Sequence, residues 1–322
     1  MDIFKPVMDV IKAGERFLVA SHAHPDGDGI GSTIALAKGI ESLGKKAVMY
    51  NTDNVPYNLK FLPYVEKVVN KLAAGETFDA TFMVDCSQRK RIGGDVEKFS
   101  REALGKIVLI DHHKTEAPES DVLCIDEDAA ATGEVIFRMF RQEGIKVTKE
   151  IAQLLFCTFV VDTGSFRYSN TTAGVLRDAA ALIEAGASPW SVTKALDESN
   201  PPESIKLLKL VLGTFEMSGK LAWIILTHQM LAEAGASIDM AEEFIGFPRS
   251  VAGVEIAILF RELKKDKWKI SFRSKDTIDV RKIAATFDGG GHAHAAGCTI
   301  EGSLASVKAR VFKELKQPLN NL

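Results

Sequence analysis

The sequence is poor in cysteine, lacks a long apolar run and carries no excess of positive charge. Its four cysteines lie far apart and form no CxxC pair, which favours buried free thiols in a reducing compartment over disulfides or a thiolate metal site. No apolar stretch approaches the roughly 20 residues that span a membrane. Charged residues interrupt the first 22 positions, where a signal peptide would lie. We therefore expect a cytoplasmic protein with no membrane partner.

The formal net charge is −3 over 322 residues. A chain of this charge has no global positive field to hold long duplex nucleic acid, so metal ions or a few Arg and Lys residues must hold any phosphate ligand locally. The length exceeds that of one average domain, and 46% of the residues are hydrophobic. We therefore expect two domains with ample core material.

In the first half of the chain, short apolar runs alternate with helix-like stretches. The runs occupy residues 16–22, 46–51, 78–87 and 106–113. Residues 32–44 between the first two predict a helix, with Ser32 as its N-cap and Gly44 as its C-cap. This alternation predicts an α/β fold with a mostly parallel sheet flanked by helices and buried on both faces. Ligands of such sheets bind beyond the carboxyl ends of the strands.

The second half predicts a change of domain. Residues 132–198 have helical spacing, and two prolines in "SNPPE" (199–203) break the pattern. We expect an N-terminal domain at 1–198, a linker helix at 199–215 and a smaller C-terminal α/β domain at 216–322, with a cleft between the domains. In the smaller domain we expect three strands, a short helix and a glycine-rich loop, "FDGGGHAHAAG" (287–297).

The loop after the first apolar run, "SHAHPDGDGIGS" (21–32), is dense in metal-ligand residues. His22 ends the run, and Asp26 and Asp28 follow. In an extended segment, the i, i+2 spacing directs two carboxylates to opposite sides, so one loop could serve two metal ions. The alternative is a cluster of Asx turns that caps the helix beginning at Ser32.

Other apolar runs end in similar residues. Asp85 follows the third run, and Asp111, His112 and His113 follow the fourth. Asp162 lies between an apolar stretch and a glycine turn. Taken singly, Asp85 and Asp162 are more readily explained as residues that end a strand or cap a helix than as metal ligands. Two successive histidines after a buried strand are harder to explain as structure, because burial of an imidazole costs free energy unless it finds a polar partner.

Taken together, these residues predict a metal site of two imidazoles and four carboxylates, and their separate structural explanations are rejected jointly. The candidate ligands are His22, Asp26, Asp28, Asp85, His112 and Asp162. Such a set without thiolates suits Mn²⁺, Mg²⁺ or Fe²⁺, and we favour Mn²⁺. Two divalent ions about 3.5–4 Å apart are the usual device for phosphoester hydrolysis.

In this order and spacing, the motifs "HAHPDGDGIGS", "VDCS", "DHH" and "VVDTGSF" resemble the four signatures of the DHH phosphoesterase family. "GGGHAHAAG" (289–297) is similar to the glycine–histidine signature of the C-terminal domain associated with that family. The length and two-domain layout resemble the NrnA-type branch, whose members are oligoribonucleases that also dephosphorylate pAp.

The resemblance assigns a role to each candidate. It implies that one metal ion is bound by His22, Asp26 and Asp85. It implies that a second ion is bound by Asp28, Asp85, His112 and Asp162, so Asp85 bridges the two. Of two further catalytic residues, Asp111 would orient a ligating imidazole and His113 would contact the scissile phosphate. His24 stands where such loops of the family commonly have Asn or another polar residue, and we expect it to be a neighbour of the site only.

In the second domain, the resemblance implies that the terminal nucleotide is held by Arg273, Ser274, Gly290, Gly291 and His292. Arginine suits bidentate contact with phosphate, and a glycine-rich backbone can form an anion cradle. The alternatives are a solvated edge-strand arginine and a flexible connector. His294 receives no role.

We therefore expect a metal-dependent phosphoesterase that releases 5′-mononucleotides from short oligonucleotides and removes the 3′-phosphate of pAp. A phosphodiesterase for cyclic or linear dinucleotides is the first alternative, and an inorganic pyrophosphatase is disfavoured by "GGGHAHAAG". A catalytically silent nucleotide-binding module is disfavoured because all six candidate ligands are present. The sequence leaves open whether the protein is a homodimer.

Overall fold

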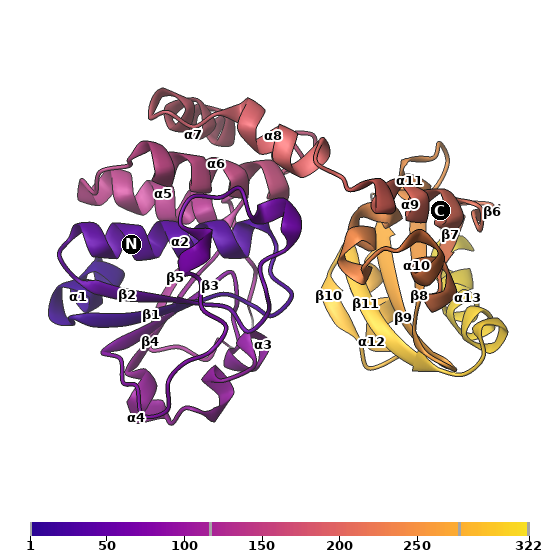
Figure 1. Cartoon of the computed structure of the whole chain (residues 1–322), viewed down its shortest axis with the longest axis horizontal. Coiled ribbons are helices and arrows are strands. Elements are labelled where there is room, and N and C mark those ends of the chain that lie inside the picture. Colours follow the sequence, from indigo (N-terminus) through magenta and orange to yellow (C-terminus); the bar gives the residue numbers. More distant parts are fainter. Residues whose placement is uncertain (1, 116–117, 276–277, 321–322) are drawn as a thin grey trace. The chain divides into compact units, whose positions relative to one another are not determined.

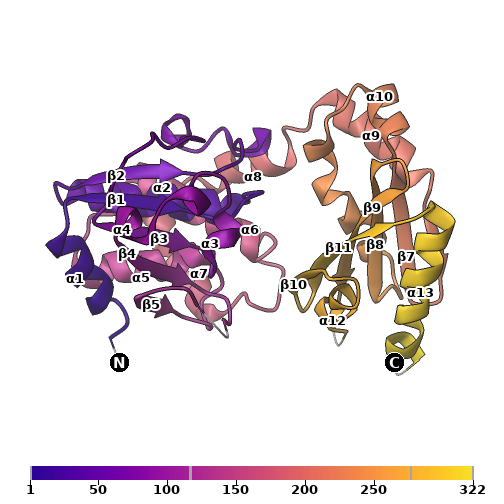
Figure 2. The ribbon, with the colours of Figure 1, turned by 90° about the horizontal axis from the view of Figure 1, so that it is seen from below.

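The computed structural model describes residues 2–115, 118–275 and 278–320. The chain divides into two compact units, Met1–Ser199 and Asn200–Leu322. Figure 1 labels their elements along the chain, and Figure 2 gives a second view of each. Each unit has its own sheet and its own hydrophobic core.

Within the described residues, the first unit contains five parallel strands in the order β2–β1–β3–β4–β5. Their bounds are β1 (Arg16–Ala20), β2 (Lys46–Tyr50), β3 (Ala80–Val84), β4 (Lys106–Asp111) and β5 (Val122–Ile125). The predicted parallel sheet is confirmed. Strand β5 was not among the predicted strands, because it has only four residues and only Cys124 among them is buried.

Helices cover both faces of this sheet. Their bounds are α1 (Lys5–Ala13), α2 (Gly27–Ser42), α3 (Arg89–Ile92), α4 (Arg101–Leu104), α5 (Thr132–Glu143), α6 (Lys149–Asp162), α7 (Ala173–Glu184) and α8 (Pro189–Asp197), with 3₁₀ turns η1 (Tyr57–Leu59), η2 (Val65–Lys67) and η3 (Val96–Lys98). Phe82 of β3 packs in the cluster formed with α2, α5 and α6, whereas Met83 packs with α3, η3 and α4. This alternation buries both faces, as the apolar runs predict.

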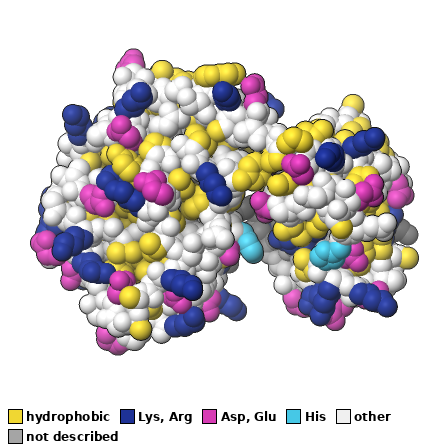
Figure 3. All heavy atoms as spheres, in the orientation of Figure 1, with side chains coloured by type: hydrophobic (Ala, Val, Ile, Leu, Met, Phe, Trp, Pro, Cys, Tyr) yellow, Lys and Arg dark blue, Asp and Glu magenta, His cyan; other side chains and the backbone are white. Residues whose placement is uncertain are grey.

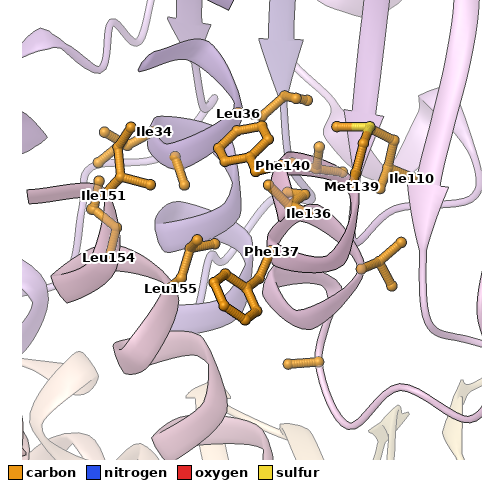
Figure 4. Packing of buried hydrophobic residues seen from close by; sticks show 14 of the residues in the cluster. Ile34, Leu36, Ile110, Ile136, Phe137, Met139, Phe140, Ile151, Leu154 and Leu155 are labelled. Atoms are coloured by element: carbon orange, nitrogen blue, oxygen red, sulfur yellow. The ribbon is translucent and has the colours of Figure 1, made fainter. Parts of the chain in front are cut away.

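The core of the first unit holds α2, α5 and α6 close together. Figure 4 shows Ile34 of α2, Phe140 of α5 and Leu154 of α6 among the packed side chains. At the start of α5, a Cβ on Gly133 would lie 2.0 Å from the Thr158 hydroxyl oxygen of α6. Only glycine allows so close an approach. The N-terminal end of α5 is therefore seated directly against α6.

The start of α2 differs from the prediction. The helix begins at Gly27, with Asp26 as its N-cap, and the Asp26 carboxylate accepts a hydrogen bond from the Gly29 amide at 2.9 Å. Ser32, predicted as the N-cap, lies inside the helix and donates to Asp28. The prediction of an extended loop through Asp28 was wrong, because Asp26 is itself a strong capping residue.

The second unit is built on a six-stranded sheet in the order β10–β11–β9–β8–β7–β6, in which β7 and β8 are parallel and the other pairs antiparallel. Its strands are β6 (Glu216–Ser218), β7 (Leu221–Leu226), β8 (Ile256–Lys264), β9 (Lys267–Ser274), β10 (Gly290–His292) and β11 (Ala295–Glu301). Its helices are α9 (Pro202–Leu212), α10 (His228–Ala234), η4 (Ile238–Ile245), α11 (Gly246–Ser250), α12 (Val280–Ala285) and α13 (Leu304–Asn320).

Two features of this unit refine the sequence analysis. The expected linker helix, α9, packs within the second unit, because Leu207 and Val211 are buried in one cluster with Ile224. The expected glycine-rich loop is a hairpin of β10 and β11, in which Gly290 lies opposite Gly297.

The surface matches the composition. Positive and negative side chains are interspersed on the face that Figure 3 shows, as expected for a formal net charge of −3. In the part of the chain that the structure describes, no helix has the length and apolar character to cross a membrane.

Candidate active site

The predicted metal ligands come together at the carboxyl ends of β1, β3 and β4. His22 follows β1, Asp85 follows β3, and Asp111 ends β4. The start of α2 and the end of α6 bring three more carboxylates to the same place. Three overlapping groups have ligand atoms within 4.8 Å of one another: His22, Asp26 and Asp85; Asp28, His112 and Asp162; and Asp85, Asp111, His112 and His113.

In the first group, the imidazole of His22 faces two carboxylates. Its Nε2 lies 3.3 Å from Oδ2 of Asp85 and 3.9 Å from Oδ2 of Asp26. Its Nδ1 lies 2.8 Å from the carbonyl oxygen of Ala23. A proton on Nδ1 satisfies that carbonyl and leaves Nε2 to act as a metal ligand.

In the second group, the imidazole of His112 is held in the same way. Its Nδ1 lies 3.2 Å from the carbonyl oxygen of Ala129. Its Nε2 lies 3.2 Å from Oδ2 of Asp162, 3.9 Å from Oδ2 of Asp28 and 4.0 Å from Oδ1 of Asp85. Among the described residues, this buried Nε2 has no hydrogen-bond partner. A lone pair aimed at carboxylate oxygens is repulsive unless a cation lies between them, so the residues fit a divalent metal ion.

Asp85 connects the two groups. Its Oδ2 faces His22, whereas its Oδ1 faces His112 and His113. Its backbone has φ +54°, in the left-handed region that costs free energy for a non-glycine residue. The strained backbone places one buried carboxylate between two sets of ligands, as a bridging ligand requires.

Asp28 is fully buried and is positioned by a helix distant in sequence. Its carboxylate accepts hydrogen bonds from the amides of Thr132 at 2.8 Å and Gly133 at 3.0 Å, at the N-terminus of α5. Ser32 adds a third at 3.0 Å to Oδ1. Since Oδ2 accepts only one of these, it keeps a lone pair on the side of His112. The helix dipole of α5 also favours negative charge at this position.

The electrostatics reflect crowded like charges. Burial, together with the carboxylates of Asp162 and Asp85, raises the pKa of Asp28 well above its usual range. Burial and the carboxylates of Asp26 and Asp85 do the same to the pKa of Asp162. Burial opposes ionisation of Asp85 too, but His113 and His22 hold the pKa of this carboxyl below its usual range. A bound cation removes the repulsion that raises the first two pKa values.

The structure changes the expected role of Asp111. Its Oδ1 accepts hydrogen bonds from the amides of His112 and His113 and lies 2.8 Å from Nδ1 of His113. Asp111 therefore orients the ring of His113, whereas the ring of His112 is oriented by Ala129. Burial lowers the pKa of His113, but Asp111 and Asp85 outweigh it and raise the pKa to about 11. His113 is therefore held as a proton-bearing group beside the ligand set.

His24 lies outside these groups. Its side chain is 81% exposed, and its Nδ1 lies 3.3 Å from Asp53.

In the second unit, Arg273 lies on β9 and Gly290 and Gly291 lie on β10. His292 ends β10, and its side chain falls outside what the structure describes. Gly291 is required by the hairpin itself, since its φ is +136° and a Cβ would lie 2.4 Å from the carbonyl oxygen of Ala295.

Ser274 is buried, and its hydroxyl is engaged within the protein. It donates to the carbonyl oxygen of Ile278 at 2.7 Å and lies 2.9 Å from Nδ1 of His294. These contacts give Ser274 a structural role, and its contact with a substrate stays a prediction. His294, to which the sequence analysis gave no role, is its partner.

Sequence reasoning missed two cations near Arg273. Arg261 of β8 lies directly opposite Lys269 of β9, and Lys269 shares its face of β9 with Arg273 because residues alternate along a strand. Burial, followed by repulsion from Arg261, lowers the pKa of Lys269. Among the described residues, the buried Nε of Arg261 has no hydrogen-bond partner. We call Arg261, Lys269 and Arg273 the basic face. Their proximity follows from the register of β8 and β9, which cannot be read from the sequence.

Comparison with known proteins gives two family matches. Residues 16–158 match the DHH family, N-terminal domain, and residues 224–321 match the DHHA1 domain. The two matches fall in the two units of the structure. Proteins with the DHH domain are metal-dependent phosphoesterases, which agrees with the ligand groups around Asp85.

The chain is also similar to named proteins over nearly its whole length. It is 33% identical to the bifunctional oligoribonuclease and PAP phosphatase NrnA of Thermus thermophilus, over 97% of this chain and 93% of that protein. It is 25% identical to the protein of the same name from Bacillus subtilis, over 89% and 90%. The crystal structure of an exopolyphosphatase-related protein from Bacteroides fragilis has a TM-score of 0.92 at 22% identity, covering 99% and 97%, and shares its fold.

Proposed function

The chain belongs to the DHH family, and from this premise we propose that it is a phosphoesterase that uses two divalent metal ions, Mn²⁺ foremost. We propose that it hydrolyses short oligonucleotides to 5′-mononucleotides and removes the 3′-phosphate of pAp. The observation that carries the proposal is the buried Nε2 of His112, which faces oxygens of Asp162, Asp28 and Asp85.

His22, Asp26 and Asp85 would hold one ion, and Asp28, Asp85, His112 and Asp162 the other. When bound, the ions supply positive charge for the phosphoryl oxygens and lower the pKa of water. Ala23 and Ala129 hold the tautomers of the two ligating imidazoles. Asp111 orients His113, which donates a proton toward the phosphate.

The overall reaction is the same for both substrate types. Water adds to phosphorus, the bond between phosphorus and the 3′ oxygen breaks, and that oxygen receives a proton. With an oligonucleotide, the phosphate stays on the 5′ carbon of the downstream nucleotide. With pAp, it leaves as inorganic phosphate. One site therefore serves both substrates, because each carries a phosphoester at a 3′ oxygen.

The basic face supports nucleotide as the substrate class. Three cations suit a few phosphates, through charge-assisted hydrogen bonds that are stronger than neutral ones. This number of cations matches short substrates better than a long duplex, whose binding requires many phosphate contacts.

A Mn²⁺-dependent assay comparing pAp, ribonucleotides of two to five residues, a cyclic dinucleotide and pyrophosphate tests this proposal. We expect cleavage of pAp and of the short ribonucleotides, and loss of both activities with a chelator. Cleavage of pyrophosphate alone would overturn the nucleotide assignment. Cleavage of the cyclic dinucleotide alone would assign the protein to that reaction instead.

A further inference from the structure

The turn that precedes α5, residues 126–131, contacts one candidate ligand and leads directly into a helix start that contacts another. The carbonyl oxygen of Ala129 lies 3.2 Å from Nδ1 of His112. Immediately after this turn, the amides of Thr132 and Gly133 donate to Asp28. The position of this turn therefore fixes the orientation of one ligating imidazole and of one ligating carboxylate.

The turn is held by Glu134, a buried acid at the start of α5. Its Oε2 accepts a hydrogen bond from the amide of Ala130 at 2.6 Å, and its other oxygen pairs with Arg138 one turn further along the helix. Glu134 is the third residue of α5, and its carboxylate reaches back past the N-cap Ala131 to the amide of Ala130, inside the turn. Burial raises the pKa of Glu134, and the amide of Ala130 and the Arg138 guanidinium counter that effect.

Arg138 also holds the other end of the turn. Its Nη1 donates to Asp126 at 2.6 Å, and its Nε donates to Asp178 of α7 at 3.4 Å. The guanidinium of Arg138 therefore joins Asp126, the first residue of the turn, to Asp178 of α7. The planar fork of arginine suits such multiple pairing, which a lysine could reproduce only in part.

Resting on the proposed function, we propose that Glu134, fixed by Arg138, is a positioning residue for the metal ligands Asp28 and His112. It contacts neither ligand and acts through the backbone of residues 129–133. Because residues 129–133 hydrogen-bond to His112 and Asp28, the effect falls first on the ligand group of Asp28, His112 and Asp162. Partners of this kind change metal affinity or activity by about 10- to 100-fold when they are altered.

The test is a calorimetric Mn²⁺ titration of the full chain, combined with steady-state kinetics on pAp. In Glu134→Gln, the side-chain carbonyl oxygen can still accept the hydrogen bond from the Ala130 amide. The side-chain NH₂ group then faces Arg138 in place of a carboxylate oxygen, so the ion pair is lost. We expect one of the two Mn²⁺ binding events to weaken by about 10- to 100-fold, while the other is retained. With Mn²⁺ below saturation, kcat falls and KM for pAp stays near the wild-type value.

Two further variants complete the design. Arg138→Lys keeps a cation beside Glu134 but loses the fork to Asp126 and Asp178, so we expect a smaller loss of affinity in the same direction. Glu143→Gln is the matched control on the same helix, where the carboxylate accepts from Gln142, and it should leave Mn²⁺ affinity unchanged.

A folded Glu134→Gln or Arg138→Lys protein with wild-type Mn²⁺ affinity and only a lower melting temperature overturns the inference. If Glu134→Gln does not fold, Arg138→Lys decides by the same criterion. A wild-type chain that binds Mn²⁺ but cleaves no nucleotide refutes the proposed function and leaves the positioning role standing. A wild-type chain that binds no Mn²⁺ overturns both.

Discussion

Five carboxylates crowd at the strand ends of the first unit, whereas Arg261, Lys269 and Arg273 share one sheet face in the second. Burial raises the pKa values of Asp28 and Asp162, and burial lowers those of Arg261 and Lys269. In both places, side chains of like charge are buried close together, which raises the free energy of their charged forms. A ligand of opposite charge lowers that free energy again. The comparison supports the proposed function, in which the first unit would hold metal cations and the second would hold phosphate.

Substitution of Asp85 should have the largest effect on activity, because this carboxylate belongs to two of the three ligand groups in the first unit. Asp85→Asn should lower kcat by about a thousandfold or more, because both ligand groups lose a member and several kcal/mol of transition-state stabilisation are lost. Steady-state hydrolysis of pAp with Mn²⁺ measures this. Asp53→Asn, which alters an acid that pairs with exposed His24, is the control. Near-normal activity of Asp85→Asn would break the two-metal assignment.

The basic face should act on binding instead. Lys269→Ala, Arg261→Ala and Arg273→Ala should each raise KM by about tenfold, since a hydrogen bond to a charged group contributes about 1.5–3 kcal/mol. The values of kcat should change little. Lys267→Ala is the matched control, because this lysine lies on the same strand and pairs with Glu301 at 3.2 Å. A fall in kcat at unchanged KM would contradict the assignment of this face to phosphate.

Thermal unfolding should separate the two units. Mn²⁺ at about 100 times its Kd stabilises a protein by about 2.7 kcal/mol, which raises the melting temperature of a unit of this size by about 5–10 °C. We expect the rise in the transition of the first unit only, and a smaller rise in Asp85→Asn. Calorimetric scans with and without Mn²⁺ measure it. An equal shift of both transitions would show that the cation is not specific to the acidic cluster.

Substitution of Ser274 should have the smallest effect, and it distinguishes a structural role of the hydroxyl from contact with substrate. Ser274→Ala removes a hydroxyl that is bonded to Ile278 and His294, so we expect a loss of about 1 kcal/mol in unfolding free energy. Chemical denaturation measures this, and KM for pAp should remain within about twofold of the wild-type value. A tenfold rise in KM without loss of stability would restore Ser274 as a substrate contact.

Much of the acidic cluster follows from sequence because the strands are parallel. Apolar runs that end in His22, Asp85 and Asp111 must bring these residues to one edge of the sheet. The start of α2 was placed five residues late, because Ser32 and Asp26 are both good capping residues and the local sequence does not choose between them.

The basic face and the Glu134 contacts could not be predicted in this way. The pair of Arg261 and Lys269 depends on the register of two antiparallel strands, and that register is set by the turn and by packing. Glu134 follows Ala131 by three residues, so the sequence lacks the Ser or Thr that would mark a capping box at this helix start. Its connection to His112 passes through a tertiary contact of Ala129, which only the folded chain shows.

The bond between Asp28 and the start of α5 also has a consequence for biosynthesis. Thr132 and Gly133 follow Asp28 by 104 and 105 residues, so a nascent chain carries His22 and Asp26 long before it can complete the second set of ligands. Loading with both ions must wait until α5 and α6 have left the ribosome and docked. A translation product that stops within β5 would therefore contain the whole first group of proposed ligands and still lack Asp162 and the helix start that holds Asp28.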